Sequence, residues 1–135
     1  SFDDWMMDRE EGQMYQYLMT EVLEHMPIED AITLLQDVFV RGNAERALVT
    51  VPNYSFNVFY AGEAIEKPNF RHDDHVWEAE AEHIGKLMNF RGDITKDIYG
   101  RDLEVQISFT TIGDTISDGS EHQCRPTCAF LFKRI

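Results

Sequence analysis

The chain is poor in cysteine, in long apolar runs and in catalytic signatures. Two cysteines in 135 residues exclude a disulfide framework, and the start of the sequence lacks the features of a secretory signal, so we expect free thiols in the cytoplasm. Its apolar runs are far shorter than the ~20 residues that a membrane-spanning helix needs. The sequence contains neither a Gly-x-Ser-x-Gly elbow nor a Gly-rich phosphate loop, so no specific catalytic or nucleotide-binding signature is present.

Basic residues are also scarce. Lys and Arg number 12 against 25 Asp and Glu, which gives a net charge of −13. The imbalance is concentrated in residues 1–45, where eleven acidic residues stand against Arg9 and Arg41 alone and give −9. A field of one sign repels phosphate groups and anionic lipids and attracts basic proteins. We therefore expect a basic protein partner and no direct binding of nucleic acid or membrane.

The composition nevertheless predicts a folded domain. A content of 43% hydrophobic and 12% aromatic residues is too high for a solvated disordered chain. The length suits one domain over residues 1–135. Gly12 weakens helix formation, so residues 1–12 are expected to be a mobile arm or a short separate helix.

Two amphipathic helices are predicted at the N-terminal end. Between residues 15 and 26 the apolar residues recur every three or four positions, which predicts a helix over 3–26 that ends before Pro27. Residues 28–40 repeat the same spacing and predict a second helix. Glu29 and Asp30 lie favourably near its positively polarised N-terminus.

After Asn43 the apolar period changes from 3.6 to 2, which predicts strands. Alternation predicts strands at 47–51, 54–60, 103–110 and 128–134, with loops at 62–73 and 113–126. Strong helix formers predict a third helix over 74–90, although the alternating charges of 77–82 leave a strand open there. The predicted fold class is α+β: two N-terminal amphipathic helices, then a mostly antiparallel sheet of about four strands, with a third helix inserted between the second and third strands.

The densest group of candidate metal ligands begins at His72. His75, Glu78 and Glu82 follow at helical spacings of three and four and would share one face of the third helix. A solvated helix face shows the same spacing, and we prefer that interpretation to a metal site. No cofactor is expected.

Glu80 and His83 are weak candidates for a catalytic pair. Glu80 falls on the apolar face of the predicted helix, where an unpaired carboxylate is costly, and His83 could pair with it. A carboxyl group with a raised pKa in a cleft suits general acid catalysis. A shifted helical phase, or a position at the rim of the core, explains the pattern more simply.

Cys124 and Cys128, with His122, bring three soft ligand types within seven residues. Zinc sites usually add a second Cys pair, which the sequence does not contain. Free thiols are therefore expected, and zinc binding or a disulfide remains the alternative.

The leading functional hypothesis is a small acidic, non-enzymatic binding protein or inhibitor. Closely spaced carboxylates can mimic the phosphates of a nucleic acid and occupy a basic nucleic-acid-handling partner, as small inhibitors from phages and mobile elements do. The residues expected to bind the partner are Asp3, Asp4, Asp8, Glu10, Glu11, Glu21, Glu24, Glu29, Asp30 and Asp37. The alternative is a small α+β enzyme or ligand-binding domain, with a pocket between sheet and helices and Glu80 and His83 as acid and base.

Overall fold

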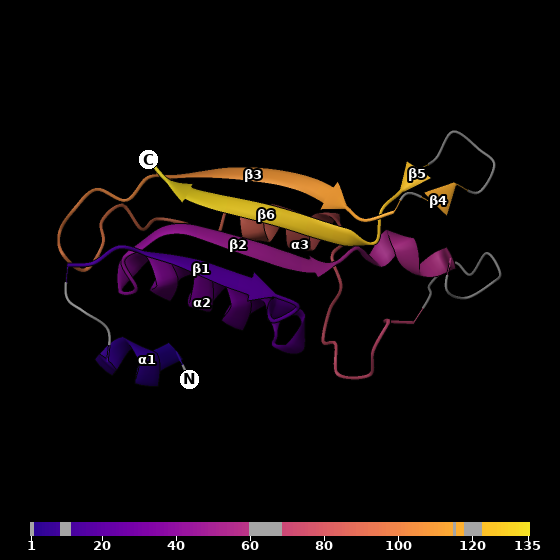
Figure 1. Ribbon diagram of the computed structural model, residues 1–135, viewed down its shortest axis with the longest axis horizontal. Coiled ribbons are helices and arrows are strands. Elements are labelled where there is room, and N and C mark those ends of the chain that lie inside the picture. Colours follow the sequence, from indigo (N-terminus) through magenta and orange to yellow (C-terminus); the bar gives the residue numbers. More distant parts are fainter. Residues whose placement is uncertain (1, 9–11, 60–68, 115, 118–122) are drawn as a thin grey trace.

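A four-stranded sheet with helices on one face forms the body of the protein (Figure 1). The computed structural model describes residues 2–8, 12–59, 69–114, 116–117 and 123–135. Within these segments the strands are β1 (Tyr15–Thr20), β2 (Ala44–Pro52), β3 (Val105–Ile112), β4 (Ile116–Ser117), β5 (Gln123–Cys124) and β6 (Thr127–Arg134). The helices are α1 (Phe2–Asp8), α2 (Ile28–Val40) and α3 (Ala81–Met88), with 3-10 turns η1 (Leu23–His25) and η2 (Tyr54–Phe59).

The sheet has the order β1-β2-β6-β3, and its first pair of strands is parallel. β1 connects through η1 and α2 to β2, and this crossover forms a β-α-β unit. β6 pairs antiparallel with both β2 and β3. The prediction of a mixed α and β fold with a four-stranded sheet is therefore confirmed, but the sheet is not antiparallel at β1.

The helix predicted over 3–26 is wrong. Only α1 is helical, and residues 15–20 form β1 because pairing with β2 supplies their backbone hydrogen bonds. Along β1 the side chains alternate, with Met19 buried on the helix side and Leu18 exposed on the other. Apolar residues on both faces of a strand imitate helical spacing, and this produced the error.

Three further predictions of local structure need correction or fall partly outside the described residues. Of the strand predicted at 54–60, residues 54–59 form the 3-10 turn η2, which follows Pro52 and Asn53 at the end of β2, and residue 60 lies outside the described residues. The third helix begins only at Ala81, and the preceding residues 69–80 form an irregular strap that the next section describes. The predicted loops at 62–73 and 113–126 include residues 62–68, 115 and 118–122, which lie outside the described residues.

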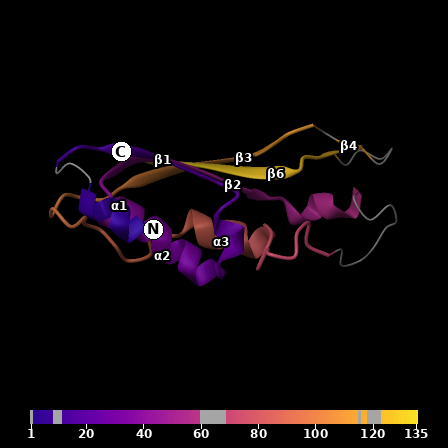
Figure 2. The same ribbon diagram turned by 60° about the horizontal axis from the view of Figure 1, so that its bottom comes forward.

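The core lies between the sheet and the helices, all of which pack on one face (Figure 2). Phe39 of α2 contacts Phe90 and Phe132, at ring-centroid distances of 5.6 and 6.5 Å, which joins both helical segments to β6. On the opposite face Leu18, Leu48 and Leu131 lie in register across three strands and remain exposed. No helix in the described segments is long and apolar enough to cross a membrane. The cytoplasmic location stays a prediction.

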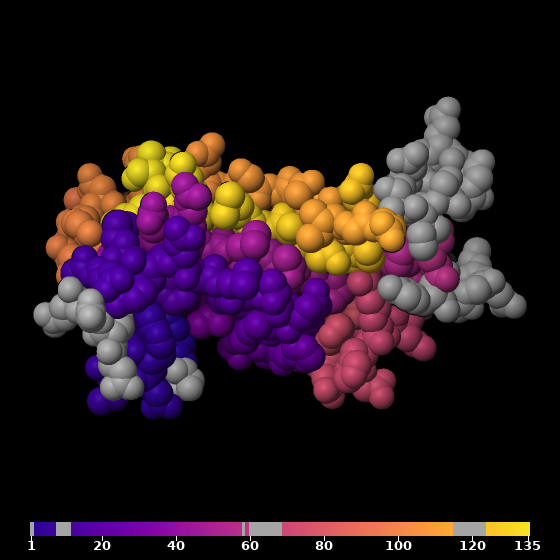
Figure 3. Space-filling model, in the orientation of Figure 1, coloured from indigo at the N-terminus to yellow at the C-terminus, as the bar shows by residue number. Residues whose placement is uncertain are grey.

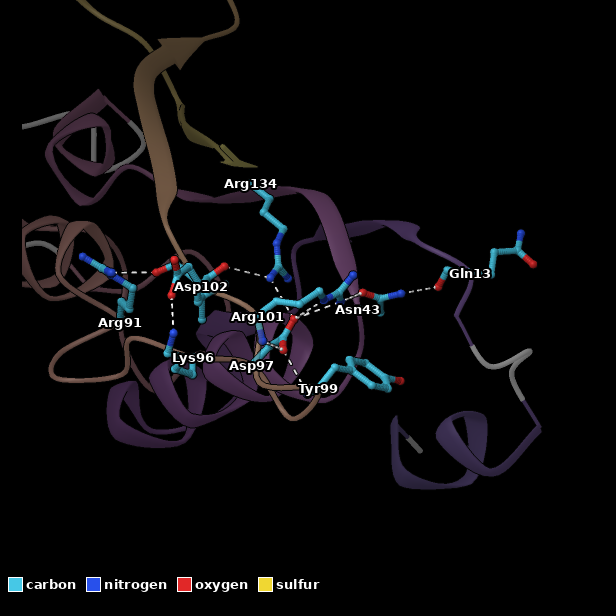
Figure 4. A network of polar contacts seen from close by, with 10 residues as sticks. Gln13, Asn43, Arg91, Lys96, Asp97, Tyr99, Arg101, Asp102 and Arg134 are labelled. Atoms are coloured by element: carbon cyan, nitrogen blue, oxygen red, sulfur yellow. Dashed lines mark hydrogen bonds and ion pairs between the residues drawn. The ribbon is translucent and has the colours of Figure 1, made fainter.

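A polar network closes the end of the sheet where β1 and β2 begin (Figure 4). The buried Asp97 carboxylate accepts hydrogen bonds from Arg101 Nε at 2.9 Å and Arg134 Nη2 at 2.7 Å. Arg101 also donates to Asn43, whose amide donates to the Gln13 carbonyl at 2.7 Å. These bonds fasten the loop between α3 and β3 to the sheet. Burial acts to raise the pKa of Asp97. The two guanidinium groups and the backbone N–H groups of Tyr99 and Arg101, which also donate to this carboxylate, outweigh burial and hold the pKa below its ordinary value.

Candidate metal centre

The candidate site lies where the two parallel strands end, at the arrowheads of β1 and β2 in Figure 1. Sheets with parallel strands bind ligands outside the carboxyl ends of those strands. Directly after β1 the chain turns at Glu21, which has a φ of 55° and donates its backbone N–H to the Thr50 carbonyl of β2 at 3.1 Å. A non-glycine residue in this left-handed conformation costs about 1–2 kcal/mol. The turn places η1, with Glu24 and His25, across the ends of the strands.

Glu24 is the most unusual side chain of the protein. Its carboxylate is fully buried, and no hydrogen-bond donor among the described residues reaches either oxygen. The Nε2 atoms of His25 and His75 each lie 3.9 Å from Oε1 of Glu24. Burial, then the neighbouring Glu21 carboxyl, raises the pKa of Glu24 to about 8. An orphaned buried carboxylate between two imidazoles is costly unless a proton or a cation neutralises it.

His75 is held with one nitrogen facing Glu24. Its Nδ1 lies 2.5 Å from Oε2 of Glu78, a carboxylate that is itself fully buried. The same carboxylate accepts hydrogen bonds from the Asn57 side chain at 2.5 Å and from the Arg71 backbone N–H at 2.8 Å. Because Glu78 accepts at Nδ1, the proton is assigned there and the lone pair of Nε2 is directed to Glu24. A carboxylate behind a histidine in this way is typical of metal-binding histidines.

Backbone contacts fix the strap that carries His75. The Val76 N–H donates to the Glu24 carbonyl at 2.7 Å, and the Trp77 indole N–H donates to the Met26 carbonyl at 2.9 Å. The rings of His25 and His75 meet edge to face, with centroids 4.9 Å apart. The two segments are thus joined at the site although about 50 residues separate them in sequence.

The ligand atoms of Glu24, His25 and His75 all lie within 4.8 Å of one another, which is the spacing of a divalent cation site. Two imidazoles and a carboxylate suit borderline cations such as Mn²⁺, Fe²⁺, Co²⁺ or Zn²⁺ better than Ca²⁺, which prefers oxygen ligands alone. Glu21, exposed beside Glu24, offers a further carboxylate. The residues present therefore fit a cation, and three protein ligands would leave positions open for a substrate oxygen.

The sequence analysis preferred a solvated helix face to a metal site, and of its four weak candidate ligands the structure places only His75 in this centre. Glu78 lies behind His75 and orients it. His72 is exposed and lies 3.6 Å from Asp74, and Glu82 is exposed on α3, 3.5 Å from His83. On the predicted helix His75, Glu78 and Glu82 would share one face, but residues 72–80 are not helical.

The sequence analysis does not identify Glu24 and His25 as ligands, because it places both in a helix over 3–26. A carboxylate and a histidine placed directly after a strand would have been the signal, since the ends of parallel strands collect functional residues. That signal depends on recognising β1 as a strand. The predicted acidic partner-binding surface includes Glu24 as an exposed residue, whereas the structure buries Glu24 fully.

Glu80 and His83 form a helix cap. Glu80 precedes α3, its side chain accepts from the His83 backbone N–H, and its own backbone N–H donates to His83 Nδ1 at 3.1 Å. The His83 ring also stacks on Trp77, with centroids 4.9 Å apart. Glu80 is exposed rather than in the core. The geometry gives this pair a capping role.

Among the described residues, several acidic residues of the N-terminal part are paired with basic side chains, and Glu24 is buried. Arg41 binds both Asp3 and Asp37, with N–O distances of 3.1 and 3.0 Å, and Glu29 lies 3.6 Å from Lys86. Asp4, Glu21 and Asp30 are exposed. The side chain of Asp8 and residues Glu10 and Glu11 lie outside the described part of the chain.

Cys124 and Cys128 are free thiols. Burial raises the pKa of both, that of Cys128 to about 11, so neither thiol is activated at neutral pH. The third member of the predicted group, His122, lies outside the described residues.

Comparison with solved structures identifies the fold. The chain is similar to the small RNA methyltransferase HEN1, at 21% identity and a TM-score of 0.66, over 88% of this chain and 13% of that one. It is also similar to a chain of the Pnkp1/Rnl/Hen1 RNA repair complex, at 26% identity and a TM-score of 0.61, over 97% and 24% of the two chains. A third match is the methyltransferase domain of bacterial CtHen1, at 19% identity and a TM-score of 0.57, over 95% and 57%.

These comparisons correct the functional hypothesis. The neighbours are a small RNA methyltransferase, a chain of an RNA repair complex and a methyltransferase domain, so the interpretation as a non-enzymatic inhibitor or nucleic-acid mimic is wrong. The structure resembles a methyltransferase fold, and the chain spans less than two thirds of the length of each of these neighbours. No family model matches the sequence, and no curated protein matches it.

Proposed function

We propose that the protein is the cation-binding part of an RNA methyltransferase. The observation that carries the proposal is the buried Glu24 carboxylate, which lacks a hydrogen-bond donor among the described residues and faces Nε2 of both His25 and His75. The methyltransferase fold of the neighbours and the RNA named in their titles support this role. The enzyme interpretation, which was the alternative from sequence, is the better supported one.

Each residue of the site has a defined task in this proposal. Glu24, His25 and His75 hold the cation, and Glu78 fixes the proton on Nδ1 of His75 so that Nε2 is free to bind. A bound divalent cation acts as a Lewis acid that lowers the pKa of a coordinated hydroxyl group. An RNA hydroxyl at an open position would then become the better nucleophile for a methyl group. The methyl donor would be bound by the part of such an enzyme that this chain does not span.

Titration with Mn²⁺ tests the site without requiring turnover. Isothermal calorimetry on the full chain should show one Mn²⁺ site that Glu24→Gln and His75→Ala each remove. The variant Glu78→Gln should weaken the affinity by about 10- to 100-fold, because it disturbs the orientation of His75. His72→Ala is the matched control, since this exposed histidine lies in the same strap outside the centre. Equal Mn²⁺ affinity in wild type and His75→Ala would contradict the proposal.

A further inference from the structure

The strap beside the metal centre presents an aromatic side chain to solvent. Phe70 is 43% exposed and contacts Tyr54 edge to face, with ring centroids 6.0 Å apart. Figure 3 shows this strap, coloured salmon, at the surface of the molecule. An open hollow of about 500 Å³ adjoins it, lined by Asn69, Phe70, His72 and Asp73. Its size lies within the range of small-molecule sites.

The backbone on both sides of Phe70 is fastened to buried groups. The Asn69 carbonyl accepts a hydrogen bond from the Asn57 side chain at 3.2 Å, and the Arg71 N–H donates to Glu78 at 2.8 Å. Glu78 is the carboxylate that orients His75. The backbone beside the aromatic ring and the ring of His75 are therefore hydrogen-bonded to the same buried carboxylate, Glu78.

The hollow is linked to the centre through His72. This residue lines the hollow, and its ring centroid lies 5.7 Å from that of His75. A molecule that places a flat ring on Phe70 would therefore extend past His72 towards the centre. Unpaired bases in RNA are bound in this manner, by stacking on aromatic side chains with hydrogen bonds to their edges.

The charge around the hollow favours a base over the phosphate backbone. Asp73 and Asp74 are exposed next to Phe70, and the whole chain carries −13. Phosphate-tracking sites use rows of Lys and Arg, and their affinity falls steeply with salt. A hollow lined by an aromatic ring, an imidazole, an amide and a carboxylate would instead contact a nucleoside.

We propose that Phe70 is a stacking platform for an unpaired RNA base next to the hydroxyl that the cation binds. This inference rests on the proposed function and names the substrate that the site prefers. The site binds an unpaired nucleotide and contacts its base more than its phosphate backbone. A blunt duplex end should therefore bind more weakly than a single strand. Binding should not weaken steeply as the salt concentration rises, because it does not depend on pairing phosphates with basic side chains.

The test is fluorescence anisotropy with a short, 5′-labelled single-stranded RNA and the full chain in saturating Mn²⁺. Phe70→Ala should weaken RNA binding by about 5- to 100-fold, the range that loss of one stacked base gives. Phe70→Tyr should retain binding because it keeps the ring. Ile98→Ala is the matched control, an exposed apolar residue in the loop at the opposite end of the strands.

Mn²⁺ calorimetry on the same proteins separates this inference from the proposed function. Unchanged RNA affinity in Phe70→Ala, with Mn²⁺ still bound, would overturn the stacking platform and leave the metal centre standing. Failure of wild type to bind RNA despite bound Mn²⁺ would overturn it as well. Loss of RNA binding in Phe70→Ala in a protein that binds no Mn²⁺ would support the platform and refute the metal centre.

Discussion

The buried Glu24 carboxyl should make the metal-free protein less stable as the pH rises. Its pKa in the folded protein is about 8, above the ordinary value of 4.5, because of burial and the adjacent Glu21 carboxyl. Between these values the folded chain retains a proton on Glu24 that the unfolded chain has released. The free energy of unfolding therefore falls as the pH rises through this window. For most acidic groups in proteins the sign is the opposite.

The size of the effect follows from the same two values. Each pH unit is worth about 1.4 kcal/mol for one proton, so the loss from pH 4.5 to 8 is on the order of 4 kcal/mol. Most small domains have only about 5–15 kcal/mol of stability, so the change should be plain in the denaturant midpoint. Saturating Mn²⁺ should reverse the slope, because the cation binds only the ionised carboxylate and its affinity rises with pH.

Urea unfolding at pH 5, 6, 7 and 8, followed by tryptophan fluorescence, measures this directly. Glu24→Gln keeps the shape and removes the ionisation, so the difference in slope between it and wild type isolates Glu24 from the other carboxylates. The variant should match wild type near pH 5 and exceed it at pH 8. If the free energy of unfolding falls with pH at the same slope in both proteins, Glu24 does not retain a proton in the folded state. The proposal that a cation replaces this proton would then be refuted.

Two other predictions concern the framework around the site. Asp97→Asn should cost about 3–5 kcal/mol at pH 7, because it leaves the Arg134 side chain, which is only 9% exposed, without its charged partner. Because the pKa of Asp97 is lowered in the folded protein, its contribution to the free energy of unfolding is fully present above the ordinary pKa of 3.8 and is lost as the pH falls further. Urea unfolding near pH 3 should therefore show a smaller loss of stability in the Asp97→Asn variant than at pH 7. Gly42→Ala should lower the thermal midpoint, since a Cβ there would lie 2.5 Å from the Val38 carbonyl oxygen. Gly85→Ala in α3 should raise the thermal midpoint, through a gain of up to about 1 kcal/mol, because apart from its chain neighbours and the adjacent backbone of its own helix nothing lies within 4 Å of the added methyl group. A lower midpoint for this variant would contradict a helical Gly85.

The alternation of apolar residues predicted most of the sheet. β2 and β6 bury the apolar side chains that face the helices, and β3 alternates between half-buried and exposed residues over Val105–Ser108. A period of two therefore located these strands, although Leu48 and Leu131 are apolar on the uncovered face. It did not locate β1, because the apolar residues between 15 and 26 also recur at helical spacings of three and four. It was wrong again at Tyr54–Phe59, where an alternating sequence forms a 3-10 turn.

The site was harder to predict than the fold because its members come from distant segments. Spacing along the chain detected His75 and Glu78, but it placed them on a helix and grouped them with His72 and Glu82. Their true companion, Glu24, lies about 50 positions earlier in sequence. Local patterns carry no information on which distant segments meet, so a centre of this kind becomes visible only when the strand order is known.

The error in the fold and the error in the function have one origin. Parallel pairing of β1 and β2 puts the residue after each strand at the same edge of the sheet, which brings Glu24 and the strap with His75 together. Had residues 3–26 formed a helix, Glu24 would have been one more exposed acid, as the charge count suggested. Its environment decides otherwise: Asp37 is neutralised by Arg41, whereas Glu24 faces two imidazoles and requires a proton or a cation. A crossover connection thus converts an acidic segment into a candidate metal centre without any change in its composition.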